Sequence, residues 1–220
     1  MVALKSRFLI DSTFIFENTY KAFLGAELFT LHGHDNTFLF GFLRDFLRLR
    51  HSIGINRGLI AIGKEAYAVT ERENIHYIVN FLIEIGIPHV FDSNNKILEI
   101  CATLSPQISN IVTKDKKLTQ FANDDILIIF PNNLKEIHYM SPKIIKSKIG
   151  VEPKHIPTFL SLTEGAKSSK LTKLQAVRLI ELYRDIDGIY ENISNISSVI
   201  KKPGWPLQNT PLVATSKYPT

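Results

Sequence analysis

Short apolar runs that alternate with longer amphipathic stretches constrain this fold more than any other feature of the sequence. Arg7–Asp11 (RFLID), Gly58–Ile62 (GLIAI) and Ile111–Thr113 have the length and composition of buried strands. Between them, Phe38–Arg50 and Glu73–Ile85 repeat apolar residues at helical spacing. Strands that alternate with helices predict an α/β fold, with a mostly parallel sheet, right-handed crossovers and helices on both faces.

The rest of the chain continues this alternation and then changes character. We expect a short strand at 89–92, a helix at 96–104, an apolar strand at 125–130, an edge strand at 136–139 and a short helix at 143–148. From Lys173 the helical period returns, with a break at Asp187-Gly188. We therefore predict an α/β domain over 1–140, a small helical subdomain over 141–200 and a poorly ordered, Pro- and Thr-rich tail over 201–220.

Composition and charge limit the compartment and the partners. The only cysteine, Cys101, permits no internal disulfide and fits a reducing compartment. No apolar run is long enough to span a bilayer, and the apolar start meets Asp11 too early for a signal peptide. We expect a protein of the cytoplasm (nucleoid) or an organelle interior, not secreted and not bound to a membrane. The net charge of +5 permits a polyanionic partner without requiring one.

The segment Ile111–Phe121 (IVTKDKKLTQF) carries the strongest functional signal. It places Asp115 just beyond a buried strand, at the edge where open α/β sheets hold their sites. Asp11 closes the first strand in the same manner. Each aspartate is either a metal ligand or a cap of the following turn, and the residues around Asp115 favour a site position.

Several motifs in a fixed order resemble the 5′→3′ exonuclease and flap-endonuclease family, and in particular the 5′→3′ exonuclease domain of bacterial DNA polymerase I. The matching residues are Ile10-Asp11-Ser12, Tyr20-Lys21-Ala22-Phe23, Gly41-Phe42, Ile85-Gly86-Ile87, Thr113 with Asp115, Leu118 and Gln120, and Asp187–Ile193. The similarity covers roughly residues 7 to 196. It implies a PIN-like 5′-nuclease sheet followed by a helix–three-turn–helix-like subdomain that binds DNA.

The resemblance also implies hydrolysis of phosphodiesters with two Mg²⁺ or Mn²⁺ ions held by clustered carboxylates. Asp11 and Asp115 would be the remaining catalytic and metal-binding residues, with Glu99 and Glu164 as further candidates. Other acidic positions of the family fall on Gly63, Lys96 and Lys117 in this sequence. We expect the two ammonium groups to pair with the remaining acids in place of metal, and two-metal catalysis to be lost or severely weakened.

Basic side chains are the second group of candidates. DNA-binding positions implied by the resemblance are Lys21, Lys114, Lys116, Lys117, Lys167, Lys170, Lys173 and Arg178. A solvated helix start explains the lysines around Asp115 equally well. Three functions stay open: a DNA-binding protein of 5′ ends, flaps or junctions with impaired nuclease activity, an active metal-dependent nuclease, and a non-catalytic adaptor. A separate DNA polymerase is a further partner that the resemblance suggests.

Overall fold

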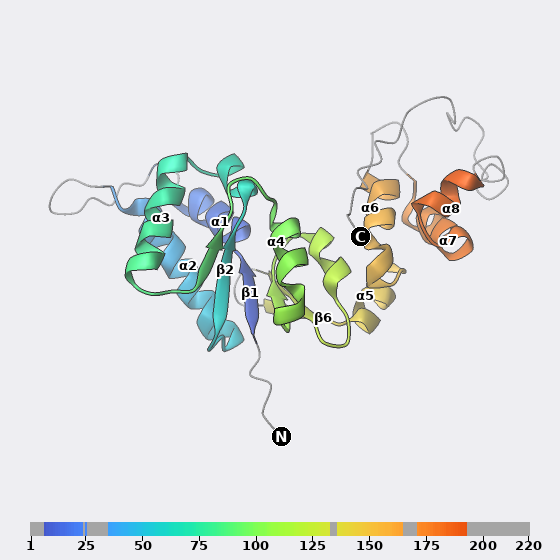
Figure 1. The fold of residues 1–220 in the computed structure, drawn as a ribbon, viewed down its shortest axis with the longest axis horizontal. Coiled ribbons are helices and arrows are strands. Elements are labelled where there is room, and N and C mark those ends of the chain that lie inside the picture. Colours follow the sequence, from blue (N-terminus) through green and yellow to red (C-terminus); the bar gives the residue numbers. More distant parts are fainter. Residues whose placement is uncertain (1–6, 24, 26–34, 133–135, 165–170, 193–220) are drawn as a thin grey trace, which may run out of the picture. The chain divides into compact units, whose positions relative to one another are not determined.

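A computed structural model describes residues 7–23, 25, 35–132, 136–164 and 171–192 (Figure 1). The chain divides into two compact units, Met1–Ile156 and Pro157–Thr220. The first unit holds the sheet, and the second is built from helices where it is described. The predicted tail over 201–220 lies outside the described residues.

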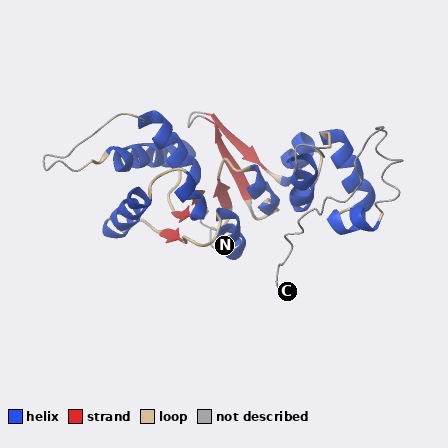
Figure 2. Cartoon of the chain, turned by 90° about the horizontal axis from the view of Figure 1, so that it is seen from above, coloured by secondary structure: helices blue, strands red, loops and turns tan. Residues whose placement is uncertain are grey.

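The first unit is organised around a six-stranded sheet with the order β3-β2-β1-β4-β5-β6. All neighbouring pairs are parallel except β5 and β6, whose antiparallel pairing is seen from above in Figure 2. The predicted mostly parallel α/β sheet is therefore confirmed. The strands are β1 (Phe8–Asp11), β2 (Gly58–Ile62), β3 (His89–Phe91), β4 (Asn110–Val112), β5 (Leu127–Asn132) and β6 (Glu136–Met140).

Helices cover both faces of this sheet, as the alternating pattern predicts. Figure 1 shows α1, α2 and α3 on one side of the strands and α4 on the other. The α-helices of the unit are α1 (Thr13–Phe23), α2 (Thr37–Ile53), α3 (Arg72–Glu84), α4 (Ile97–Leu104) and α5 (Pro142–Ile149). Short 3-10 turns are η1 (Lys64–Ala68), η2 (Ser105–Gln107), η3 (Lys116–Phe121) and η4 (Pro153–His155). No helix among the described residues is long and apolar enough to cross a membrane.

The alternation of side chains along β1 explains the two covered faces. Phe8 and Ile10 belong to a core cluster that also takes in aromatic residues of α1 and α2, such as Phe16 and Phe42. Leu9, which points the other way in a strand, is also fully buried. Strands buried on both faces are typical of parallel sheets, and they leave the strand ends as the accessible parts of the sheet.

Gly41 sets the close approach of α1 and α2. A Cβ atom at this position would lie 2.5 Å from Cγ2 of Thr19 and 2.8 Å from the ring of Phe23. The missing side chain therefore lets α2 pack closely against the second half of α1.

The second unit contains α6 (Ile156–Glu164), α7 (Lys173–Tyr183) and α8 (Ile186–Glu191). Thr172 caps α7, because its hydroxyl accepts from the backbone N–H of Gln175. Asp185 caps α8 by accepting from the N–H of Gly188. The predicted helical subdomain over 141–200 contains these helices and also α5 and η4, which belong to the first unit.

Candidate functional site

The carboxyl ends of β2, β1 and β4 meet at one edge of the sheet, called here the carboxyl edge. Asp11 ends β1, and Gly63 and Thr113 directly follow β2 and β4. Ile10 is paired in register with Val112, so Asp11 and Thr113 come side by side. Parallel sheets place their functional groups at this edge, so the candidate residues lie where the sequence predicts a site.

Asp11 is the buried centre of the carboxyl edge, with an exposed fraction of 3%. Its Oδ2 accepts a hydrogen bond of 2.7 Å from the Thr113 hydroxyl, and its Oδ1 accepts one of 2.9 Å from the N–H of Thr13. The same Thr113 oxygen accepts from the N–H of Asp115 at 2.9 Å. Thr113 thus connects the two aspartates, a role that sequence reasoning did not assign to it.

The pKa of Asp11 is determined mainly by the burial of its carboxyl group. Burial raises the pKa of Asp11 to about 6, although the hydrogen bonds from Thr113 and Thr13 act in the opposite direction. The negative charge of Asp115 raises that pKa further. A carboxyl group that is buried and faces another acid favours its protonated form, because burial and the neighbouring negative charge both disfavour ionisation.

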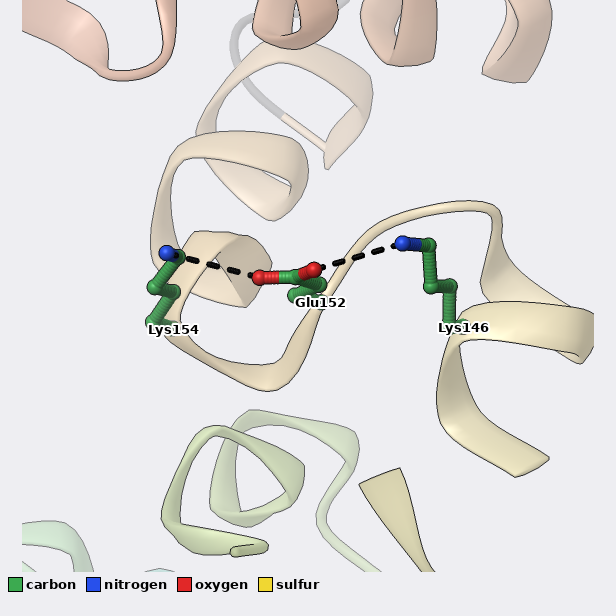
Figure 3. Close-up of polar contacts among 3 residues, drawn as sticks. All are labelled: Lys146, Glu152 and Lys154. Carbon is green, nitrogen blue, oxygen red and sulfur yellow. Dashed lines mark hydrogen bonds and ion pairs between the residues drawn. The ribbon is translucent and has the colours of Figure 1, made fainter. Parts of the chain in front are cut away.

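Glu152, elsewhere in the same unit, shows the opposite situation (Figure 3). Its carboxylate lies between two ammonium groups, 3.2 Å from Nζ of Lys146 and 3.4 Å from Nζ of Lys154. Hydrogen bonds from these two lysines hold the pKa of Glu152 below its ordinary value. Glu152 is therefore an example, within this protein, of a carboxylate that lysines neutralise.

The expected pairing of Lys96 and Lys117 with the acids of the carboxyl edge is wrong. Among the described residues, no ion pair joins either lysine to Asp11, Asp115 or Glu99. Both lysines are exposed, and both contribute backbone N–H groups to the edge. For Asp11 the reason is energetic, since an ammonium group that stays in water avoids the desolvation that pairing with a buried carboxylate requires. The exposed Asp115 and Glu99 accept from backbone N–H groups instead.

The other acids of this edge cap turns and a helix. Asp115 Oδ1 accepts from the N–H of Lys117 at 2.9 Å and caps η3. Glu99 Oε2 accepts from the N–H of Lys96 at 2.6 Å at the start of α4. The sequence left open whether Asp115 is a metal ligand or a cap. In this structure its contacts are those of a cap.

Glu65 is a fourth acid of this edge, and it is one that sequence reasoning missed. Its Oε2 accepts from the N–H of Ile97 at 3.1 Å, so it also serves the start of α4. The family resemblance places an acidic position at Gly63, whereas the acid of this segment is Glu65, two residues further along. A search for acids within one turn of each strand end would have found it.

Gly63 has no room for the carboxylate that the family resemblance leads one to expect there. A Cβ atom at this position would lie 2.8 Å from the backbone nitrogen of Ile97 and 2.9 Å from Oε2 of Glu65. The start of α4 and the Glu65 side chain therefore occupy the space in front of β2. Local packing therefore closes the position at which the resemblance implies an acid.

The residues present do not fit a pair of divalent ions. Within the described parts of the chain, no three Asp, Glu, His or Cys side chains gather in a way that could hold a metal ion. The thiol of Cys101 is buried beneath the edge, where burial and the charges of Asp11, Asp115 and Glu65 raise its pKa. A thiol kept protonated in this manner is a packing group rather than a ligand.

Comparison with known proteins gives matches to solved structures only. No protein-family model matches the chain, and no curated protein sequence matches it. The catalytic core of Rad2 in complex with a DNA substrate superimposes with a TM-score of 0.61 at 15% identity, covering 88% of this chain and 66% of that one. A 5′-exonuclease of T5 with bound zinc ions gives a TM-score of 0.60 at 9% identity, covering 89% and 84%.

The fold is that of the 5′-nucleases. A third neighbour, a bacteriophage T5 flap endonuclease pseudo-enzyme in complex with DNA product and metal ions, has a TM-score of 0.56 at 10% identity. It covers 86% of this chain and 79% of its own. At these identities the likeness concerns the fold alone, and the chain spans 66% of the Rad2 core.

Within this 5′-nuclease fold, three of the predicted DNA-binding lysines lie next to the acids of the carboxyl edge. Lys114, Lys116 and Lys117 are exposed, and Nζ of Lys114 lies 5.7 Å from the centre of the Phe14 ring. Lys21, at the end of α1, lies 3.8 Å from Glu17 one turn earlier.

The remaining predicted residues belong to the second unit. Glu164 is the exposed last residue of α6, and Lys173 and Arg178 are exposed on α7. Lys167 and Lys170 lie outside the described residues.

Proposed function

We propose that this protein binds DNA at 5′ ends, flaps or junctions through a 5′-nuclease fold whose two-metal hydrolysis is lost or severely weakened. The solved neighbours include Rad2 bound to a DNA substrate and a T5 flap endonuclease bound to DNA, which supports DNA as the ligand class. A separate DNA polymerase and a reducing compartment, such as the cytoplasm or an organelle interior, are the setting we propose for it.

The observation that carries this proposal is the use of the acids at the carboxyl edge. Asp115, Glu99 and Glu65 each accept from a backbone N–H, and Asp11 accepts from Thr13 and Thr113. Two-metal hydrolysis needs several carboxylates whose free oxygens converge on the ions. Acids that are divided among separate caps supply no such cluster, and the closed space in front of Gly63 removes a further position.

One neighbour shows that this fold can accommodate a change of the same type. The T5 flap endonuclease pseudo-enzyme carries a lysine in place of one aspartate, and it was crystallised with DNA product and metal ions. By the family resemblance, Lys117 is also a lysine at an acidic position. The comparison supports DNA binding as a property that can persist when such an acid is replaced.

The basic residues at the carboxyl edge provide the means of binding. Lys64, Lys96, Lys114, Lys116 and Lys117 all follow strand ends or start the next segment at this edge, and all are exposed. Contacts between lysines and phosphates supply much of the affinity for nucleic acids and make it depend on salt. An edge that carries these exposed lysines is suited to holding the phosphates of a nucleic acid.

A labelled 5′-flap duplex tests both parts of the proposal. We expect binding that weakens steeply between about 50 and 200 mM salt, and no cleavage with Mg²⁺ or Mn²⁺. The double variant Lys114→Ala/Lys117→Ala should weaken binding by about tenfold and lower the salt slope by roughly two. The matched variant Arg48→Ala/Arg57→Ala removes the same charge away from the carboxyl edge and should change binding less than about twofold.

The two other functions make different predictions in the same assay. An active nuclease would cleave the flap with Mg²⁺ or Mn²⁺ and lose this cleavage in Asp115→Ala, which would overturn the proposed loss of catalysis. A non-catalytic adaptor without a role in DNA binding would show no salt-dependent shift, and this result would overturn the proposed DNA binding.

A further inference from the structure

The opposite edge of the sheet, called here the amino edge, carries an open groove with a volume of about 640 Å³. The starts of β1 and β2, the end of α2, the turn after α3 and η2 surround it. Its apolar wall includes the half-buried Leu59, Ile87 and Ile108, and its rim carries Arg7, Arg50 and Arg57. This amino-edge groove plays no part in the function proposed above, and it falls in the size range of ligand sites.

The charge of the groove is one-sided. Its lining includes three arginines and no aspartate or glutamate. Among the described residues, no carboxylate lies within ion-pair distance of Arg7, Arg50 or Arg57. Arg50 donates from Nε to the carbonyl of Ile55 at 3.1 Å, and Arg7 donates from Nη1 to the carbonyl of Gln107 at 3.5 Å. Because each guanidinium has five N–H donors, most donors at this rim have no protein partner in these contacts.

Another arginine of α2 shows that the helix can neutralise such a charge. Nε of Arg44 lies 2.8 Å from Oδ1 of the buried Asp45, and its guanidinium carbon lies 4.6 Å from the centre of the Phe23 ring. Arg50, almost two turns further along α2, has no such carboxylate. The guanidinium of Arg44 is therefore neutralised within the chain, whereas that of Arg50 faces the groove without a carboxylate partner among the described residues.

We propose that the amino-edge groove binds an acidic segment of a partner protein that inserts aliphatic side chains between the three arginines. Guanidinium groups pair with carboxylates in a planar, two-bond geometry, which suits Asp and Glu side chains at the rim. The wall offers aliphatic surface for Leu, Ile or Val. Charge complementarity and an apolar centre with a polar rim are the features of a peptide-binding groove.

The shape of the wall disfavours a nucleotide as the ligand. Phe8 and Phe46 line the groove, but they are exposed by only 9% and 5%, so neither ring offers an open face for a base to stack upon. Duplex DNA contacts its partners mainly through phosphates on open basic surfaces rather than by inserting apolar groups. An acidic peptide with apolar anchors uses both the rim and the wall.

The position of the groove lets it act independently of the carboxyl edge. In a parallel sheet the amino and carboxyl ends of the strands lie at opposite edges, and β1, β2 and β4 are parallel neighbours. A partner segment bound at the amino edge would therefore leave the lysines of the carboxyl edge accessible. The proposal goes beyond the proposed function and holds whether or not the protein cleaves DNA.

Fluorescence anisotropy with a defined peptide tests the proposal on the full chain. The probe is a fluorescein-labelled dodecapeptide that alternates Leu with Asp and Glu, and its control replaces every acid by Asn or Gln. We expect saturable binding of the acidic peptide, and loss of at least about tenfold in affinity in Arg57→Glu. Arg48→Glu makes the same charge change at an exposed position of α2 outside the groove and should alter affinity less than about twofold.

A second variant distinguishes a loss of peptide binding from a folding defect. Gln107 is an exposed residue of the groove lining, and Gln107→Glu places a carboxylate beside Arg7 with little change in shape. It should weaken peptide binding several-fold while thermal unfolding and flap binding stay unchanged. Equal loss in Arg57→Glu and Arg48→Glu, equal binding of the Asn/Gln peptide, absence of binding at millimolar peptide, or stoichiometric displacement by AMP would each overturn the proposal.

Discussion

The two edges of one sheet treat charge in opposite ways. At the carboxyl edge, the acids accept hydrogen bonds from backbone N–H groups of the following turns. At the amino edge, three arginines surround an apolar groove without a carboxylate among its lining residues. The acids of the first edge therefore find their partners within the chain, whereas the arginines of the second have no carboxylate partner among the described residues.

The difference shows how the surroundings of a charged group determine what it does. At the carboxyl edge, the acids accept hydrogen bonds as caps, and Glu65 and the start of α4 fill the space in front of Gly63. Acids that cap turns and helices contribute to the stability of the fold. We therefore predict that changes to the buried and capping groups of the carboxyl edge alter stability, whereas changes to the arginines of the amino edge alter peptide binding.

The largest effect should be a pH dependence that comes from Asp11. Its folded pKa of about 6 lies above the ordinary value of 3.8, so folding favours the protonated carboxyl group. The contribution to stability is fully present below pH 3.8 and is lost as pH rises through 6. Without added divalent metal, the free energy of unfolding should fall by up to roughly 3 kcal/mol between pH 4 and 7 from this group.

Asp11→Asn should remove most of this slope in urea unfolding measured across the pH range, because the amide keeps the shape and does not titrate. The exposed Asp124→Asn serves as the control and should keep the slope. A wild-type protein without the slope, or a slope that persists in Asp11→Asn, would contradict the assignment.

Filling the space at Gly63 should produce the next effect. Gly63→Ala places a Cβ atom against the nitrogen of Ile97 and the carboxylate of Glu65, and it should lower the free energy of unfolding by about 1–3 kcal/mol. Lys64→Ala changes the exposed neighbour and should cost less than about 0.5 kcal/mol. If both variants were equally stable, the position would be open and an acid could return there without cost.

Removing the Thr113 hydroxyl should have a smaller effect. Thr113→Val keeps the side-chain shape but leaves Asp11 without its side-chain donor and the N–H of Asp115 without its acceptor. The cost in chemical denaturation should be about 1–2 kcal/mol. Thr103→Val removes an exposed hydroxyl that donates to the carbonyl of Glu99, and a cost as large as that of Thr113→Val would show that the link between the aspartates is unimportant.

The smallest effect on stability is expected at the amino edge. Arg57→Ala should change the free energy of unfolding by less than about 0.5 kcal/mol, since no carboxylate pairs with Arg57. Arg44→Ala should cost clearly more, because it leaves the carboxylate of the buried Asp45 without its guanidinium partner. A large loss of stability in Arg57→Ala would mean that the arginines of this edge serve the fold.

Much of the fold follows from the sequence because its strands and most of its helices are strongly patterned. The expected helices at 38–50 and 73–85 correspond to α2 (Thr37–Ile53) and α3 (Arg72–Glu84), displaced by at most three residues. Helix α1 was not predicted, since its Thr-Phe-Ile-Phe start has no polar stripe. It is buried at Phe14, Ile15 and Phe16, and tertiary packing against α2 determines its structure rather than local pattern.

The candidate site was harder to predict than the fold. The strand ends correctly place Asp11 and Asp115 at one edge. The hydrogen bonds that these carboxylates accept could not be predicted, because they depend on the conformation of the turns that follow the strands. The expected pairing with Lys96 and Lys117 failed because a sequence reveals charge but not the direction in which a long side chain leaves the backbone. Glu65 was within reach of a search near the strand ends, whereas the role of Thr113 depends on hydrogen bonds that the sequence does not reveal.

Titration of the metal-free protein with Mn²⁺, followed by electron paramagnetic resonance of the free ion, tests the central claim most directly. If the acids of the carboxyl edge act as caps, Mn²⁺ should bind no more tightly than about millimolar, and Asp11→Asn should titrate in the same way as the wild type. Two Mn²⁺ ions bound per chain at micromolar concentration, and lost in Asp11→Asn, would contradict it.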